Sequence, residues 1–278
     1  MHVSHPQGGH SASDATGYLQ SYRDMHPLWY YSTLGYLVLM VLFLVAQGFD
    51  DRLLQGISVW DKPFKFALSL AVYFGTMLIF VNYMPAGYFS TRRGRLLTAI
   101  PIAMALFEMT YIAIQAALGE ASHYNRDTVY NAKMYSLMAV GALSLVAALL
   151  WMAVSIARVN ILSNPLILAI VIGLALTFFL GGGFGSYLGA HPGHSVGSVS
   201  NNASGIWLFH WARDGGDLRV AHFFGLHAMQ VLPLFALLLP KSLPRSLGVT
   251  SVLLFATVYT ALTVFTFYQA VQGQPFIG

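Results

Sequence analysis

Seven apolar runs dominate the sequence, and each is long enough to cross a bilayer as a helix. The hydrocarbon core is about 30 Å thick, which a helix of about 20 residues spans. Only 9% of the residues are charged, whereas a soluble domain has roughly 25%. We therefore predict an all-α polytopic membrane protein with seven transmembrane helices in a lipid bilayer. The runs cover residues 29–49, 63–83, 96–119, 134–157, 165–183, 220–239 and 247–270.

The remaining segments divide the chain simply. Residues 1–28 are polar, which predicts a disordered tail, and residues 29–278 form a single seven-helix membrane domain. One connection, 184–219, is long and rich in glycine and serine, as functional loops often are. The chain has no cysteine, so thiolate metal sites and thiol nucleophiles are excluded. Its net charge of +4 needs no nucleic-acid partner, because basic cytoplasmic loops explain it.

The dense basic sequence "RRGR" at 92–95 sets the expected orientation. Lysine and arginine gather in cytoplasmic loops, and the cations on the other side of the membrane alternate with acidic residues. We therefore predict a cytoplasmic N-terminus and an extracytoplasmic loop 184–219. All histidines from His123 to His227 then lie on the extracytoplasmic side or just below its surface.

The third span carries a carboxylate where lipid disfavours one. Glu108 lies near its middle, and Tyr111 and Gln115 follow at the spacing of one helix face. An ionisable residue inside a membrane costs about 2.5–3.5 kcal/mol by insertion scales, and such residues are functional by default. We interpret Glu108 and Gln115 as candidate catalytic residues. The alternative is a protonated Glu108 that only bonds a neighbouring helix.

Two lysines begin the second span. Lys62 and Lys65 lie in its first turns, and both can extend to lipid headgroups instead of facing the protein. Lys65 lies one turn deeper, so we expect it to face inward. There it would pair with Glu108 or hold an anionic group, and we include it among the catalytic candidates.

The sixth span has a polar first half with Arg219, His222, His227 and Gln230. The two histidines are five residues apart, about 140° around a helix, so they cannot chelate one ion as an i,i+4 pair can. Each therefore needs partners from other helices or from the long loop. In that loop, the aromatic sequence around His210 predicts a position at the membrane surface.

Three stretches resemble a family of bacterial integral membrane proteins whose function is uncharacterised. They are "WDKPFKFALS" (60–69), "EMTYIAIQAALGEASHYN" (108–125) and "GHSVG" with "GDLRVAHFFGLHAMQVLP" (193–197, 216–233). The resemblance implies a bacterial inner membrane location but no activity. It singles out Trp60, Lys62, Lys65, Glu108, Gln115, His123, Asn125, His194, Asp217, Arg219, His222, His227 and Gln230.

The chain departs from the family patterns at three positions. Asp61 stands where the pattern has an apolar residue, Leu118 stands where it has arginine, and Tyr124 replaces phenylalanine. The loss of arginine at Leu118 puts in doubt a cation at that point.

Three functions remain open. The first is a redox protein that binds haem b between two axial histidines, with Arg219 on a propionate. Cofactor ligands would come from His123, His194, His222 and His227. The second is a zinc or copper enzyme that uses these histidines as metal ligands and acts on a quinone or lipid-like substrate. The third is a metal-free proton-linked transporter, sensor or accessory subunit.

Overall fold

A computed structural model describes residues 12–160, 164–198, 205–206 and 209–278. Its elements, in chain order, are α1 (Ala12–Met25), α2 (Pro27–Gln47), β1 (Leu53–Leu54), β2 (Ile57–Ser58), α3 (Asp61–Phe80), η1 (Val81–Tyr83), η2 (Tyr88–Ser90), α4 (Arg92–Leu118), α5 (Val129–Asn160), α6 (Pro165–Leu176), η3 (Thr177–Gly182), α7 (Gly183–Ala190), β3 (Ser195–Val196), β4 (Gly216–Asp217), α8 (Leu218–Leu238) and α9 (Arg245–Val271).

Within the described residues, seven helical segments are long and apolar enough to cross a membrane. This confirms the predicted all-α membrane fold. The segments are Pro27–Gln47, Asp61–Tyr83, Arg92–Leu118, Val129–Val159, Pro165–Ala190, Leu218–Leu238 and Arg245–Val271.

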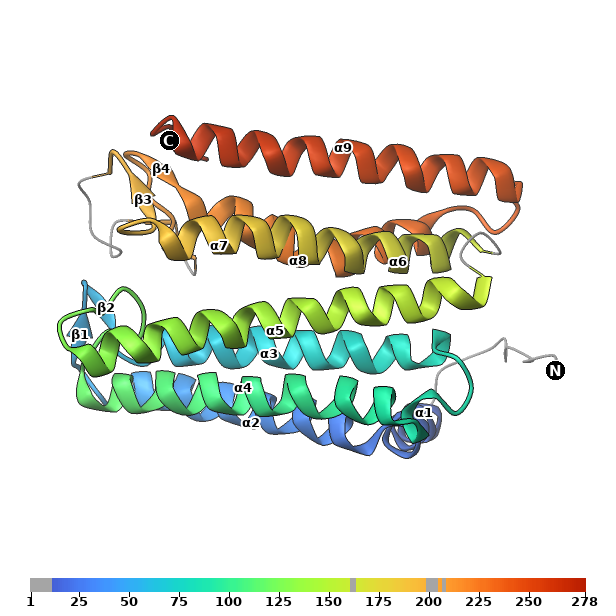
Figure 1. Cartoon of the computed structure of the whole chain (residues 1–278), viewed down its shortest axis with the longest axis horizontal. Coiled ribbons are helices and arrows are strands. Elements are labelled where there is room, and N and C mark those ends of the chain that lie inside the picture. The colour runs from blue at the N-terminus through green and yellow to red at the C-terminus, as the bar shows by residue number, and fades with distance from the viewer. Residues whose placement is uncertain (1–11, 161–163, 199–204, 207–208) are drawn as a thin grey trace.

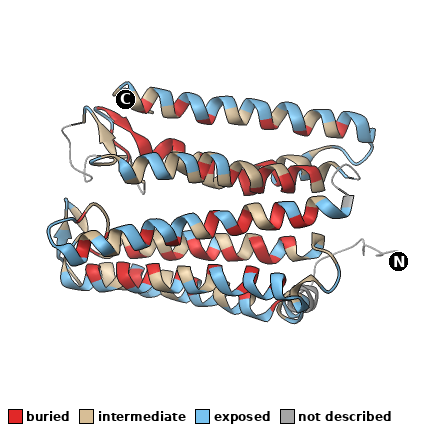
Figure 2. Cartoon of the chain, viewed as in Figure 1, coloured by how far each residue is buried: buried red, intermediate tan, exposed pale blue. Residues whose placement is uncertain are grey.

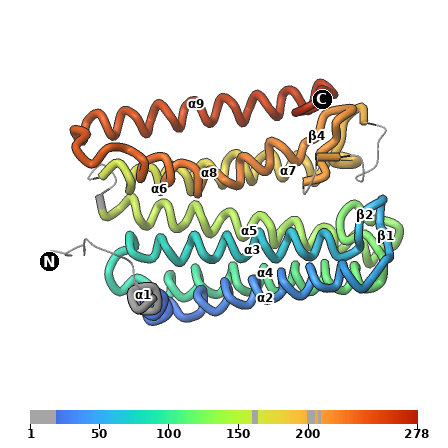
Figure 3. The backbone as a smooth tube through the Cα atoms, turned by 180° about the vertical axis from the view of Figure 1, so that it is seen from behind, coloured from blue at the N-terminus to red at the C-terminus, as the bar shows by residue number. Residues whose placement is uncertain are grey.

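The helices run along one common direction and form a layered bundle (Figure 1). α9 lies at one edge, followed by α6, α7 and α8, then by α5 and α3, with α2 and α4 at the other edge. The view from behind shows the same order (Figure 3). Both short antiparallel ladders, β1–β2 and β3–β4, lie at one end of the bundle, which we call the hairpin end. α1 lies at the opposite end, which we call the α1 end.

Local sequence signals set the helix boundaries. Pro27 and Pro165 occupy first-turn positions, where the missing N–H costs nothing. The Thr91 hydroxyl accepts a hydrogen bond from the N–H of Gly94 and caps α4. Gly119 ends α4 with a φ of 75°, a left-handed conformation that glycine adopts without strain.

The buried residues concentrate on α3, α4, α5, α6 and α8, whereas α2 and α9 have fewer of them (Figure 2). The largest apolar cluster joins α2, α3, α4, α5 and α6 through fully buried residues such as Trp29, Phe74 and Met152. A second cluster joins α6, α8 and α9 and contains Leu168 and Leu232. Small residues allow close approach there: a Cβ on Gly225 would lie 2.5 Å from the backbone nitrogen of Gly181.

The fifth span and the polar tail differ from the sequence prediction. The fifth span does not stop at residue 183 but continues through η3 and α7 to Ala190, so the loop begins later than predicted. Two of its glycines pack closely against α8: Gly181 meets Gly225, and Gly185 meets the His222 ring. Within the polar tail 1–28, the structure describes the helix α1, which packs against α2.

Candidate functional site

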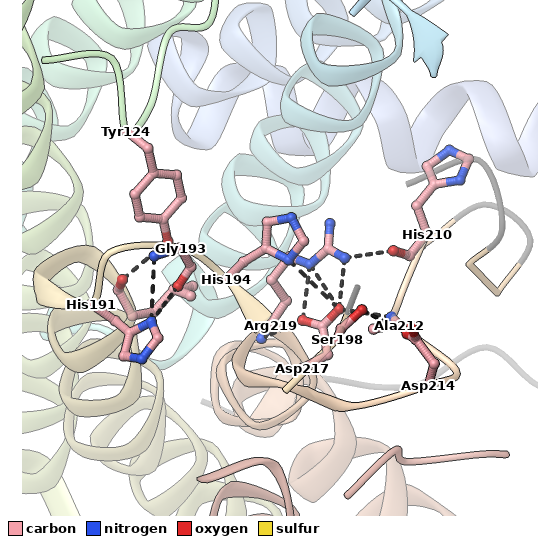
Figure 4. A network of polar contacts seen from close by, with 11 residues as sticks. Tyr124, His191, Gly193, His194, Ser198, His210, Ala212, Asp214, Asp217 and Arg219 are labelled. Atoms are coloured by element: carbon pink, nitrogen blue, oxygen red, sulfur yellow. Dashed lines mark hydrogen bonds and ion pairs between the residues drawn. The ribbon is translucent and has the colours of Figure 1, made fainter. Parts of the chain in front are cut away.

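Asp217 and Arg219 form a buried ion pair at the hairpin end, where the loop after α7 enters α8. The Asp217 side chain is 0% exposed and caps α8 by accepting a hydrogen bond from the N–H of Arg219. The Arg219 guanidinium donates to both carboxylate oxygens, with Nη2 2.6 Å from Oδ2, and the Ala212 N–H donates to Oδ2 at 2.9 Å. Such charge-assisted bonds offset the cost of burying a carboxylate. The pair thus holds the loop against the first turn of α8 (Figure 4).

His194 lies beside this pair, and one of its ring nitrogens lacks a hydrogen-bond partner in the described part of the chain. This buried atom, Nδ1, is 3.9 Å from Asp217 Oδ2, which is too long for a hydrogen bond. Burial lowers the pKa of His194 to about 4; Arg219 and Lys62 act in the same direction, whereas Asp217 opposes them. The imidazole is therefore neutral at pH 7. Figure 4 shows the ring next to the Arg219 guanidinium.

Asp61 connects the start of α3 to the long loop. One carboxylate oxygen lies 2.6 Å from Lys65 Nζ, and the other lies 3.3 Å from His210 Nε2. The backbone carbonyl of His210 accepts a hydrogen bond from Arg219. His210 is therefore half-buried against the start of α3, and its backbone has a positive φ of 56°. Its predicted position at the membrane surface stays a prediction.

His123 occupies the connection between α4 and α5. Its ring packs edge-on against Phe66, at 6.3 Å between centroids, and against Tyr135, at 5.8 Å, and its Nδ1 lies 3.2 Å from the Ser122 hydroxyl. Burial holds the pKa of His123 well below its usual value, and the Lys62 charge lowers it further. A second imidazole near Lys62 is thus neutral at pH 7.

Lys62 is the cation that these groups share. It lies half-buried in the first turn of α3, and its charge acts on His123, His194 and Arg219. Within the described ranges, no carboxylate lies within ion-pair distance of its ammonium group. Lys65, which we expected to be the inward-facing lysine, pairs instead with Asp61 one turn back on the same helix.

Glu108 lies deeper in the membrane domain, on α4, and is 1% exposed. Its Oε1 packs where a side chain at Gly141 would be, 2.6 Å from an ideal Cβ, and has no hydrogen-bond partner among the described residues. The charge of Glu108 interacts with Lys62 and with the hydroxyl of Tyr36, another buried atom without a described partner. Tyr111, on the same face of α4 as predicted, is also buried. Buried polar groups therefore lie within the apolar part of the bundle.

Gln115 has a local contact. It is buried on the same face as Glu108, and its Nε2 donates to the carbonyl of Ala121 at 3.2 Å. This bond closes the turn that follows α4.

The two histidines of α8 have different surroundings from His123 and His194. The Nδ1 of His222 lies 2.8 Å from the carbonyl of Gly181 in η3, and Gly185 packs against the ring edge. The His227 ring lies 4.2 Å from the Phe223 ring. These contacts turn His222 toward η3 and α7.

Three other residues that the resemblance singles out make local bonds. The Trp60 indole donates to Asp50 at 2.8 Å, and Asn125 accepts from the backbone two residues further on. Gln230 donates to the Thr76 hydroxyl at 3.0 Å, which links α8 to α3.

The donor groups match metal ligation only in part. In the described portion of the chain, no three His, Asp or Glu side chains gather closely enough to hold a metal ion. For haem b, His222 has the expected anchoring, since a ring nitrogen bound to a backbone carbonyl leaves Nε2 for a metal. His227 lies about 140° around the same helix from His222. It therefore cannot supply the second axial ligand on the opposite face of a haem that His222 binds. The described residues therefore do not form a bis-histidine site around His222 and His227.

The sequence did not lead us to predict the roles of three residues of this site. Asp61 had a signal, because its spacing from Lys65 is that of a helical ion pair. Asp217 was noted only through the resemblance, although aspartate just before an apolar helix is a typical N-cap. Gly141 had no signal, because its role depends on how α5 packs against α4.

Comparison of the chain with models of protein families, with curated proteins and with solved structures gives no match.

Proposed function

We propose that this chain is a proton-linked membrane protein, a transporter or sensor, in which Glu108 is the proton-binding group inside the membrane. A single observation supports the proposal: a carboxylate that is 1% exposed has an oxygen without a hydrogen-bond partner in the described structure. A buried ionised group without partners is strongly disfavoured, so such a carboxylate binds a proton, a water molecule or a ligand. Intramembrane carboxylates commonly serve in proton relays.

The hairpin end supplies the groups through which protons would reach Glu108. The charge of Lys62 interacts with Glu108, His123 and His194. Both imidazoles are neutral at pH 7, and a neutral imidazole both accepts and donates a proton. Proton transfer between the hairpin end and Glu108 would follow this series of side chains.

The experiment compares proton movement in liposomes that contain the wild type, Glu108→Gln or Glu120→Gln. Glu120 is the only other glutamate of the chain and is exposed, so its variant is the matched control. With a membrane potential imposed and a pH dye inside, the wild type and Glu120→Gln should move protons, and Glu108→Gln should not. Equal rates in all three proteins would contradict the proposal.

We also propose that the hairpin end faces the extracytoplasmic side of a bacterial inner membrane, with the N-terminus inside. The three arginines of "RRGR" lie at the α1 end, where α4 begins. Because the chain has no cysteine, single cysteines are informative without background labelling. Cysteine at Lys241, at the α1 end, should be protected from an impermeant reagent in intact cells, and cysteine at Glu120 should react. The reverse pattern would overturn the orientation.

A redox protein with haem b is the second candidate, and the anchored ring of His222 is the observation that favours it. The zinc or copper enzyme has less support, because the described residues provide no triad of ligands. A quinone or lipid-like substrate belongs to these two candidates. A visible spectrum before and after dithionite tests the first, and elemental analysis tests the second. A Soret band that His222→Ala removes would favour haem over the proton-linked function.

A further inference from the structure

We propose that the hairpin end binds an anionic oxygen group, a phosphate or carboxylate, between Lys62 and His194 beside the Arg219–Asp217 pair. The inference deepens the proposed function and rests on it in one respect, because Lys62 belongs to both sites. It adds the chemical class of the ligand.

The local balance of charge favours an anion. Arg219 is paired with Asp217, and Lys65 is paired with Asp61, whereas Lys62 has no ion-pair partner among the described residues. Of these three cations, Lys62 is thus the one that no described carboxylate pairs with. A half-buried ammonium group without a counter-ion attracts an anion more strongly than an exposed one, because less water screens it.

The other titratable groups around Lys62 do not supply that counter-ion. The imidazoles of His123 and His194 are neutral at pH 7, and His210 is engaged with Asp61. The Tyr124 hydroxyl donates a hydrogen bond to the carbonyl of Leu188. The remaining carboxylate that Lys62 interacts with, Glu108, is buried deeper on α4 and makes no ion pair.

Lys62 and His194 both have hydrogen-bond donors to offer. The Lys62 ammonium has three N–H groups, and the buried Nδ1 of His194 has no partner in the described structure. A neutral imidazole can place its proton on Nδ1 and donate to an anion. An oxygen bound there would satisfy a buried polar atom that is otherwise unsatisfied, which is a favourable exchange.

The surrounding contacts hold these donors in position. The β3–β4 ladder pairs Ser195 with Asp217, so the chain next to His194 is fixed to the start of α8. The hydroxyls of Tyr124 and Tyr135 donate to the carbonyls of Leu188 and Gly189 at the end of α7. A preorganised site loses less free energy in ordering its side chains when a ligand binds.

Two sources can supply such a group: a soluble anion and the headgroup of an anionic lipid. Lys62 lies in the first turn of a membrane-spanning helix, where a long side chain can reach lipid headgroups as well as water. The experiment therefore includes one arm for each source.

The experiment measures thermal unfolding in an uncharged detergent. One arm adds inorganic phosphate or acetate against chloride at equal ionic strength; the other adds phosphatidylglycerol against phosphatidylcholine in mixed micelles. A ligand that binds only the folded state raises the midpoint saturably. We expect saturable stabilisation in at least one arm, and about tenfold weaker binding by Lys62→Gln. Lys241→Gln, an exposed cation at the α1 end, is the matched control and should bind as the wild type does.

The arms and variants separate the outcomes. Stabilisation by phosphate or acetate identifies a soluble anion, and stabilisation only by phosphatidylglycerol identifies a headgroup. If Lys62→Gln does not fold, His194→Asn replaces it and should also weaken binding. Stabilisation in neither arm, or unchanged affinity in these variants, overturns the inference. If Glu108→Gln loses proton movement but no anion stabilises any of the proteins, the proposed function is supported and the anion site is refuted.

Discussion

Replacing Gly141 with alanine tests whether α5 positions the Glu108 carboxylate. An added Cβ would lie 2.6 Å from Oε1, 3.3 Å from Cγ and 3.4 Å from Cδ of Glu108. Non-bonded atoms prefer separations of about 3.5 Å or more, so Oε1 must retreat by roughly 1 Å and the outer half of the side chain must follow. Overpacking a buried site of this kind costs about 1–3 kcal/mol. We therefore expect Gly141→Ala to lower the free energy of unfolding by that amount.

A double-mutant cycle isolates the contact. In Glu108→Ala the clashing atoms are gone, so Gly141→Ala should then cost no more than about 0.5 kcal/mol. The free energies come from reversible unfolding in mixed detergent micelles, followed by circular dichroism. Gly35→Ala is the control, because a Cβ there meets nothing within 4 Å. If Gly141→Ala costs the same with and without the Glu108 side chain, the two residues do not touch and our reasoning about the site is wrong.

Three further predictions use the same unfolding measurement. Burial lowers the pKa of His26 from 6.5 to about 4, so between these pH values the unfolded chain binds more protons than the folded one. The free energy of unfolding should therefore fall by about 3 kcal/mol as the pH falls from 6.5 to 4. This loss should be absent in His26→Asn. Asp217→Ala should cost about 3 kcal/mol, because it takes the carboxylate from a part-buried Arg219, and Asp217→Asn should cost less because asparagine still caps α8. Gly225→Ala should cost about 1–3 kcal/mol, because its Cβ would meet the η3 backbone, whereas Gly183→Ala has open space and should be neutral or stabilising.

The sequence predicted the membrane architecture because hydropathy alone determines where a chain can cross lipid. The seven runs coincide with the seven long helices, and the proline at the start of α6 marks its first turn. The buried face of α4 was also predicted, since Glu108, Tyr111 and Gln115 follow helical spacing and are all buried. These features depend on local periodicity, which is visible in the sequence.

The partners of the polar residues depend on how helices pack, and local periodicity does not specify that. Lys62 and Lys65 are almost equivalent in sequence, yet Asp61 neutralises only Lys65. The histidines at 123, 194, 222 and 227 were expected to gather at one site. The structure places His123 and His194 near Lys62, and it places His222 against η3, because the glycines of the fifth span remain helical.

Lys62 belongs to both proposed sites, and the two sites can therefore influence each other. Its positive charge favours the ionised form of any nearby carboxylate, and Glu108 is the buried carboxylate that it interacts with. An anion bound at the hairpin end would compensate that charge, so Glu108 would bind a proton more readily when the anion is present. Thermodynamic linkage makes the effect reciprocal. Protonation of Glu108 would remove its negative charge, and Lys62 would then bind the anion at the hairpin end more strongly. Two groups that share one cation thus provide a direct physical route for coupling an anion at the surface to a proton inside the membrane.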